Sequence, residues 1–106
     1  MGKVVKMSAK EFADEILWDE DVHPFAMEKN GDNEEDDTLN YDYWYFVKPV
    51  FAGGMMFLVF GYYGDYAGEK LKVYSAEERS VESIVEDYLR NVGFANMEVY
   101  YDMEDE

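Results

Sequence analysis

The sequence contains no cysteine and a single histidine, His23. Without cysteine, neither a disulfide framework nor a thiolate metal site can form. With one imidazole, nucleophile–base pairs and zinc sites have almost no residues to be built from. His23 precedes Pro24 at the expected end of a helix, which favours a structural or incidental role. We therefore expect no enzyme, no catalytic residue and no cofactor.

Long apolar runs are also missing. The longest, Met55 to Phe60, is far too short to span a bilayer, and Met1 to Met7 lacks the apolar stretch of a signal peptide. The glycine pairs around Gly61 and Gly64 connect expected strands and do not open a helix, so they do not indicate a phosphate-binding loop. Together with the absence of cysteine, these features predict a cytoplasmic protein.

Basic residues are scarce: nine Lys and Arg stand against 25 Asp and Glu, a formal net charge of -16. From Glu11 to Asp42 there are thirteen acids and one base, a net of -12, whereas Tyr43 to Ala76 has two acids and three bases, a net of +1. Crowded like charges raise the free energy of the compact state. Such a surface also repels nucleic-acid phosphates and anionic membranes. We expect a basic protein partner, no direct binding of nucleic acid and no membrane association.

The composition nevertheless supports a core, because 48% of the 106 residues are hydrophobic and 18% are aromatic. Disorder, the usual result of high net charge, is thereby disfavoured. We predict a single domain over residues 1–106, with an acidic loop at about 25–40 and an acidic C-terminal tail at about 102–106.

Two helices are predicted. Ser8 and Glu11 have the spacing of a capping box, Met7 and Phe12 that of a hydrophobic staple, and the apolar positions that follow lie on one helical face. A second capping box, residues 75–78, is expected to open the other helix, with Gly93 at its C-cap.

Four strands are predicted from alternation and apolar runs: residues 41–48, closed by Pro49, then 54–63, 69–74 and 95–102. In the third, Leu71 and Val73 are expected to point inward, and Tyr74 outward. The predicted fold class is α+β in the order α-β-β-β-α-β, an antiparallel three-stranded meander plus a fourth strand with the helices packed on the sheet.

The candidate partner-binding residues are the carboxylates of the first helix, the loop and the tail, with tyrosines as anchors. Residues three or four apart on a helix lie side by side, so the helix acids form a stripe. Exposed aromatic side chains beside charge are typical anchors of protein interfaces. The set is Glu11, Asp14, Glu15, Asp19, Glu34, Glu35, Asp36, Asp37, Asp102, Glu104, Tyr62 and Tyr66.

A calcium loop is the main alternative for the acidic loop, because Asp32, Glu34 and Asp36 alternate like the first ligands of an EF-hand. The sixth position, however, is Asp37 where Gly is required, and the twelfth is Tyr43 where Glu is required. We therefore predict no specific metal site.

In size, lack of cysteine, charge and α+β make-up, the chain resembles the small acidic phage-encoded inhibitors that mimic DNA, the anti-CRISPR and antirestriction proteins. The resemblance implies a non-enzymatic inhibitor that occupies the basic groove of a CRISPR effector, restriction enzyme or nuclease toxin. The alternative is an acidic immunity or adaptor protein that binds a protein partner through its aromatic sheet surface.

Overall fold

The computed structural model describes residues 2–27, 44–62, 71–77, 79–94 and 96–104. The strands, in chain order, are β1 (Gly2–Ser8), β2 (His23–Ala26), β3 (Tyr45–Ala52), β4 (Met55–Tyr62), β5 (Lys72–Ser75) and β6 (Glu98–Glu104). They form one six-stranded sheet in the order β1-β6-β2-β3-β4-β5, and every neighbouring pair is antiparallel. With the helices α1 (Ala9–Trp18) and α2 (Val81–Val92), this confirms the predicted α+β single domain.

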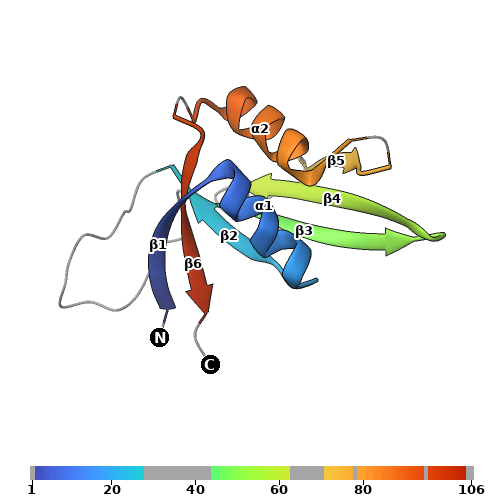
Figure 1. Cartoon of the computed structure of the whole chain (residues 1–106), viewed down its shortest axis with the longest axis horizontal. Coiled ribbons are helices and arrows are strands. Elements are labelled where there is room, and N and C mark those ends of the chain that lie inside the picture. Colours follow the sequence, from blue (N-terminus) through green and yellow to red (C-terminus); the bar gives the residue numbers. More distant parts are fainter. Residues whose placement is uncertain (1, 28–43, 63–70, 78, 95, 105–106) are drawn as a thin grey trace.

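Both helices pack on the same face of the sheet, where they contact each other (Figure 1). The core lies between the two layers. α1 contributes Phe12 and Ile16, and α2 contributes Ile84 and Leu89, all fully or almost fully buried. The sheet contributes aromatic rings; that of Phe60 stacks on Tyr88 of α2 with 4.2 Å between ring centroids.

The predicted start of α1 is confirmed. The Ser8 hydroxyl accepts from the Glu11 N–H at 3.2 Å, and the Glu11 carboxylate accepts from the Ser8 N–H at 2.9 Å. Met7 and Phe12 are both buried in the core, as a hydrophobic staple requires.

The predicted start of α2 is wrong. Its N-cap is Ser80, whose hydroxyl accepts from the Ser83 N–H at 3.1 Å, and Ser75 is the last residue of β5. The N–H of Ala76 donates to the Met56 carbonyl, which holds this part of the chain on the sheet. Gly93 is the C-cap, with φ of 95°, as predicted.

Two strands were not predicted. β1 pairs along its whole length with β6, and it turns Val5 and Met7 toward the core. β2 lies in the region predicted as the end of a helix followed by a loop, so Phe25 and Ala26 belong to the sheet and not to the acidic loop. Both strands pair with segments distant in sequence and leave little local signal.

Pro49 does not close β3, contrary to prediction. The turn at Gly53 and Gly54, both at positive φ, pairs Ala52 with Met55 and fixes the register. Counting back from that pair, Pro49 falls where the backbone N directs away from β4. On that side the pairing with β2 covers only residues 45–47, so the missing N–H removes no ladder bond.

The predicted orientation of the third strand is also wrong. Tyr74, in β5, faces the core and packs edge-on against Phe60, whereas Leu71 and Val73 are exposed. Tyr74 shares its side of the sheet with Leu58, its partner in the ladder, and Val73 lies opposite Val59 on the other face.

Candidate functional site

The solvent face of α1 carries four of the seven predicted contact residues that the structure describes. Burial of Ala9, Phe12, Ala13 and Ile16 fixes the rotation of the helix. The opposite side is left to Glu11, Asp14 and Asp19, which are exposed, and to Glu15, which is half-buried. The structure therefore brings these four predicted carboxylates together on one helix and its C-cap, Asp19, and Glu11 and Glu15 lie one turn apart with spacing i, i+4.

The acids continue past the end of the helix. Glu20 and Asp21 are exposed, so residues 10–21 hold six acids and one base, a net of -5. We call Asp14, Glu15, Leu17, Trp18, Asp19, Glu20 and Asp21 the acidic end of α1. Glu20 and Asp21 were not among the predicted contact residues, although the charge run that contains them was recognised.

Hydrogen bonds hold this segment in place. The Asp19 carbonyl accepts from His23 Nε2 at 2.7 Å, and the Asp19 carboxylate accepts from the Asp21 N–H at 3.0 Å. The Lys48 ammonium donates to the Glu20 carbonyl at 3.0 Å. The backbone after the helix is thus tied to β2 and β3, while the side chains of Glu20 and Asp21 remain at the surface.

The position of these acids works against the helix. The C-terminus of a helix has partial negative charge, and an acid there typically costs about 0.3–1 kcal/mol. α1 has no basic residue in its last turn, and its C-cap is Asp19. The local stability of the helix therefore does not explain the acidic end of α1.

Trp18 stands among these carboxylates with 85% of its surface exposed, and the neighbouring Leu17 is 60% exposed. Trp18 lies four residues after Asp14, so the two share one side of the helix. Tryptophan is one of the residue types most enriched at the energetic centre of protein interfaces, where binding of the partner buries it. Trp18 lay outside the predicted apolar stripe, which was the signal for its exposure.

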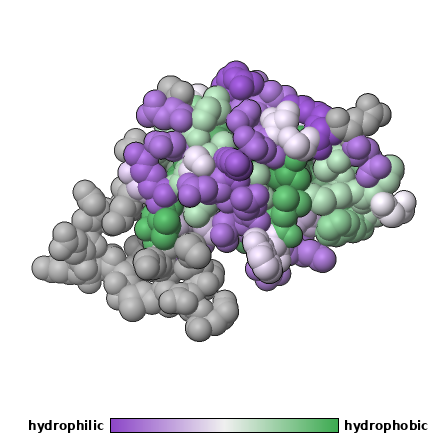
Figure 2. Space-filling model, in the orientation of Figure 1, coloured by the Kyte–Doolittle hydropathy of each residue, from purple (hydrophilic) through white to green (hydrophobic). Residues whose placement is uncertain are grey.

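Ion pairs neutralise acids elsewhere. Arg79 and Arg90 contact the Asp87 carboxylate of α2 at 2.6 and 3.0 Å, and Lys6 contacts Glu98 at 3.3 Å. The hydrogen bond from Arg79 is the main cause that holds the pKa of Asp87 below its ordinary value. Within the described residues, no ion pair involves a carboxylate of the acidic end of α1. Hydrophilic residues dominate the surface over α1 and α2 (Figure 2).

His23 is buried, and both of its ring nitrogens are hydrogen-bonded. A carbonyl oxygen can only accept a hydrogen bond, so His23 Nε2 carries a hydrogen and donates it to the Asp19 carbonyl. Nδ1 then accepts a hydrogen bond from the Tyr101 hydroxyl at 2.9 Å. Burial, with the nearby carboxylates of Glu15, Asp19 and Asp102, raises the pKa of Tyr101 to about 12. Through these contacts, the buried imidazole helps to hold β2 against β6.

Other predicted contact residues are placed differently. Asp102 is buried in β6 opposite Val4, so it is not part of a surface tail; residues 102–104 belong to the strand, and Glu104 pairs with Gly2. Tyr62 packs its ring 4.8 Å from that of Tyr45. The loop acids Glu34, Glu35, Asp36 and Asp37, with Tyr66, lie outside the described residues.

A cleft of about 290 Å³ lies away from α1, lined by Met27, Gly93 and Phe94 with residues of β1 and β6. Its charged groups, Lys6 and Glu98, pair with each other. In the part of the chain that the structure describes, no three acidic or histidine side chains are grouped to hold a metal ion. The residues proposed for a calcium loop fall outside that part.

Comparison of the chain with protein-family models, with curated proteins and with solved structures finds no match. Among the described residues, no helix is long and apolar enough to cross a membrane.

Proposed function

We propose that the chain is a non-enzymatic inhibitor that binds the basic groove of a nucleic-acid-binding protein, such as a CRISPR effector, restriction enzyme or nuclease toxin. The acidic end of α1 is its described contact surface. The observation that carries the proposal is the exposure of Trp18 among carboxylates that lack ion-pair partners within the described residues.

The chemistry of the surface suits such a groove. Arg and Lys side chains that bind phosphates also form charge-assisted hydrogen bonds with carboxylates, and Arg does so with two parallel bonds. Asp14, Asp19, Glu20 and Asp21 offer such acceptors within a short stretch of chain. Trp18 adds a large apolar area that stacks on guanidinium groups, which phosphates alone cannot provide.

The energetics also favour this function. The acids at the C-terminal end of α1 oppose the helix dipole and one another, so the free chain holds them at a cost in stability. Contact with a basic groove removes that repulsion, and the net charge of -16 accelerates association by electrostatic steering. The predicted loop acids Glu34 to Asp37 would add further carboxylates to the contact with the partner.

The test uses a purified DNA nuclease with an arginine-lined groove and measures inhibition of cleavage. Inhibition is expected to weaken as NaCl is raised and as competing duplex DNA is added, because the chain and DNA share one site. Trp18→Ala is expected to weaken inhibition by about thirty-fold, the loss of roughly 2 kcal/mol that marks a hot spot. Inhibition that competing DNA does not relieve would contradict the proposal.

A matched pair of variants separates position from total charge. Asp14→Asn, Glu20→Gln and Asp21→Asn together remove three charges from the acidic end of α1. Glu77→Gln, Glu82→Gln and Glu86→Gln remove three from α2 and the segment before it. The first set is expected to weaken inhibition at least about tenfold more than the second, a difference of about 1.4 kcal/mol. Equal losses would assign the effect to net charge alone.

The contribution of the loop needs its own variant. Reversal of Glu34, Glu35, Asp36 and Asp37 to Lys is expected to abolish inhibition while the fold, followed by circular dichroism, is retained. Unchanged inhibition would exclude the loop and leave the acidic end of α1 as the contact surface.

A further inference from the structure

The hairpin formed by β3 and β4 extends beyond the helices. In Figure 1 its turn projects past α1 and α2 along the long axis of the molecule, which measures 45 Å against 28 Å in the other directions. Near the turn, Phe51 and Met55 are 56% and 41% exposed. In Figure 2 hydrophobic residues gather on the surface at the same end of the molecule. The structure therefore leaves an apolar projection in solvent.

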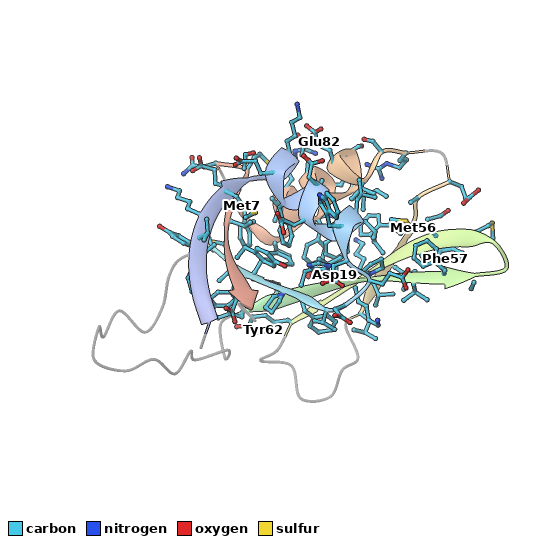
Figure 3. The ribbon with its side chains drawn as sticks, turned by 60° about the horizontal axis from the view of Figure 1, so that its bottom comes forward. Met7, Asp19, Met56, Phe57, Tyr62 and Glu82 are labelled. Atoms are coloured by element: carbon cyan, nitrogen blue, oxygen red, sulfur yellow. The ribbon has the colours of Figure 1, made fainter. Side chains whose placement is uncertain are left out.

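The face of this region that turns away from the helices is mostly apolar, and its polar members are Lys48, opposite Val59, and Ser75, opposite Phe57. Strand alternation and register place side chains of β3, β4 and β5 together on it. Val73 is 58% exposed, and Leu71, whose side chain lies beside Gly61, is also exposed. We call this set the arm face: Val50, Ala52, Met55, Phe57, Val59, Leu71 and Val73. Figure 3 shows Phe57 on the hairpin, apart from Asp19 and Glu82 on the helix side.

Charge distinguishes the arm face from the rest of the chain. Between Trp44 and Tyr62 the only charged residue is Lys48, in a protein with a net charge of -16. Two copies of such a chain repel one another through most of their surface. A contact between copies is thus favoured where acids are absent, and the arm face satisfies this condition.

We propose that the arm face is a self-association surface, on which two copies of the chain pack face to face about a two-fold axis. Stacked sheets lie about 10 Å apart, and in each copy the acidic end of α1 belongs to a helix layer about 10 Å thick on the opposite side of its sheet. The acidic surfaces of the two copies then face outward, separated by more than about 20 Å. At physiological salt the screening length is about 8 Å, so their repulsion is weak in this arrangement.

The hairpin edge disfavours the other common mode, addition of a strand. Among the described residues, no strand pairs with the outer edge of β3 beyond residue 47, and Pro49 lacks the N–H that would point outward there. Side-chain packing of the arm face remains the available contact. A second copy is the occupant because it meets the arm face with the same uncharged side chains and keeps the acidic end of α1 on the opposite side of its sheet.

Sedimentation equilibrium of the whole chain tests the proposal. A species near twice the chain mass of 12.4 kDa is expected, in equilibrium with the single chain. Raising NaCl from about 0.1 M to about 1 M shortens the screening length from about 10 Å to about 3 Å, and association is expected to tighten. A single chain at every protein concentration and at both salt concentrations would overturn the proposal.

Two variants place the contact, and one controls it. Met55→Asp and Val73→Asp each put a charge on the arm face at an exposed position, and both are expected to shift the mass to that of one chain. Trp18→Ala, which removes a more exposed apolar side chain from α1, is expected to leave the self-association unchanged. A dimer that survives both arm variants, or that is lost only with Trp18→Ala, would contradict the assignment.

Failure here is distinguishable from failure of the proposed function. Inhibition through carboxylates weakens with salt and depends on Trp18, whereas self-association through the arm face strengthens with salt and depends on Val73. The chain could instead remain monomeric and bind another protein that the Val73→Asp variant no longer binds. That result would assign the arm face to the other protein and would overturn the second-copy proposal.

Discussion

The Tyr101 hydroxyl donates to Nδ1 of His23 at 2.9 Å, a bond that joins the side chains of two neighbouring strands, β6 and β2. On its other side, His23 donates from Nε2 to the Asp19 carbonyl at the end of α1. This chain of two hydrogen bonds connects the sheet to the acidic end of α1. It explains why a protein with one histidine buries it.

Tyr101→Phe removes the donor to His23 and leaves a buried acceptor without its partner. Such a loss typically costs about 1–3 kcal/mol, so the free energy of unfolding in urea is expected to fall by that amount. Tyr62→Phe is the matched control, because Tyr62 has a ring contact with Tyr45 and no hydrogen bond from its hydroxyl among the described residues. Its effect is expected to lie within about 0.5 kcal/mol. Equal effects of the two substitutions would mean that the His23 bond contributes nothing.

Stability is expected to fall at alkaline pH. Burial raises the pKa of Tyr101 to about 12 from an ordinary value of 10.0, and burial also raises the pKa values of Tyr45 and Tyr88. The folded state therefore holds these protons more tightly than the unfolded state does. The resulting stability is fully present below about pH 10 and is lost as the pH rises toward about 12.

Urea unfolding at a series of pH values measures this loss. Tyr101→Phe removes one of the three titrating groups, so the difference in stability between the wild type and this variant is expected to narrow above about pH 10. Parallel decline of the two proteins would show that Tyr101 does not carry the pH dependence.

Local signals predicted much of this fold from the sequence. The capping box at Ser8 and Glu11 and the glycine at position 93 are short-range patterns, and both helices are present. β1 and β2 were missed because their pairing, such as Val5 opposite Tyr101, depends on residues far apart in the chain. The boundary at Pro49 was wrong for the same reason, since its tolerance depends on where β2 ends.

The candidate site also has one part that local patterns predicted and another part that depends on residues far apart in the chain. Helical periodicity placed Glu11, Asp14, Glu15 and Asp19 together, because that pattern is local. The place of Asp102 within a strand that continues to Glu104, and not in a tail, could not be predicted, because it depends on the pairing of β6 with β1, two segments far apart in the chain. The apolar arm face was likewise hidden: an apolar run indicates a buried strand, and only the arrangement of the helices shows which end of β4 they leave uncovered.

The start of α2 gives a direct comparison of two serines. Ser80 accepts from the Ser83 N–H at 3.1 Å as the N-cap, whereas Ser75 accepts from the Glu77 N–H at 3.3 Å at the end of β5. Ser80→Ala is expected to lower the free energy of unfolding by about 1 kcal/mol, the usual cost of losing a cap. Ser75→Ala is expected to cost less than about 0.5 kcal/mol. A larger loss at Ser75 would show that the helix begins where the sequence pattern first suggested.

Gly61 is held against an aromatic ring, and a larger residue there is expected to be costly. A Cβ at this position would collide with the ring of Phe46, its partner in the ladder, and would lie 2.8 Å from a methyl group of Leu71. Gly61→Ala is therefore expected to lower the free energy of unfolding by about 1–3 kcal/mol through overpacking.

Phe46→Leu tests the cause of this cost. In the double variant the smaller side chain makes room for the new methyl group, so the two substitutions are expected to be less harmful together than the sum of their separate effects. Gly53→Ala is the control: its cost arises from a φ of 60° with no atom within 4 Å of the new Cβ, so Phe46→Leu should leave that cost unchanged. Additive effects of Gly61→Ala and Phe46→Leu would mean that contact with this ring does not require glycine at position 61.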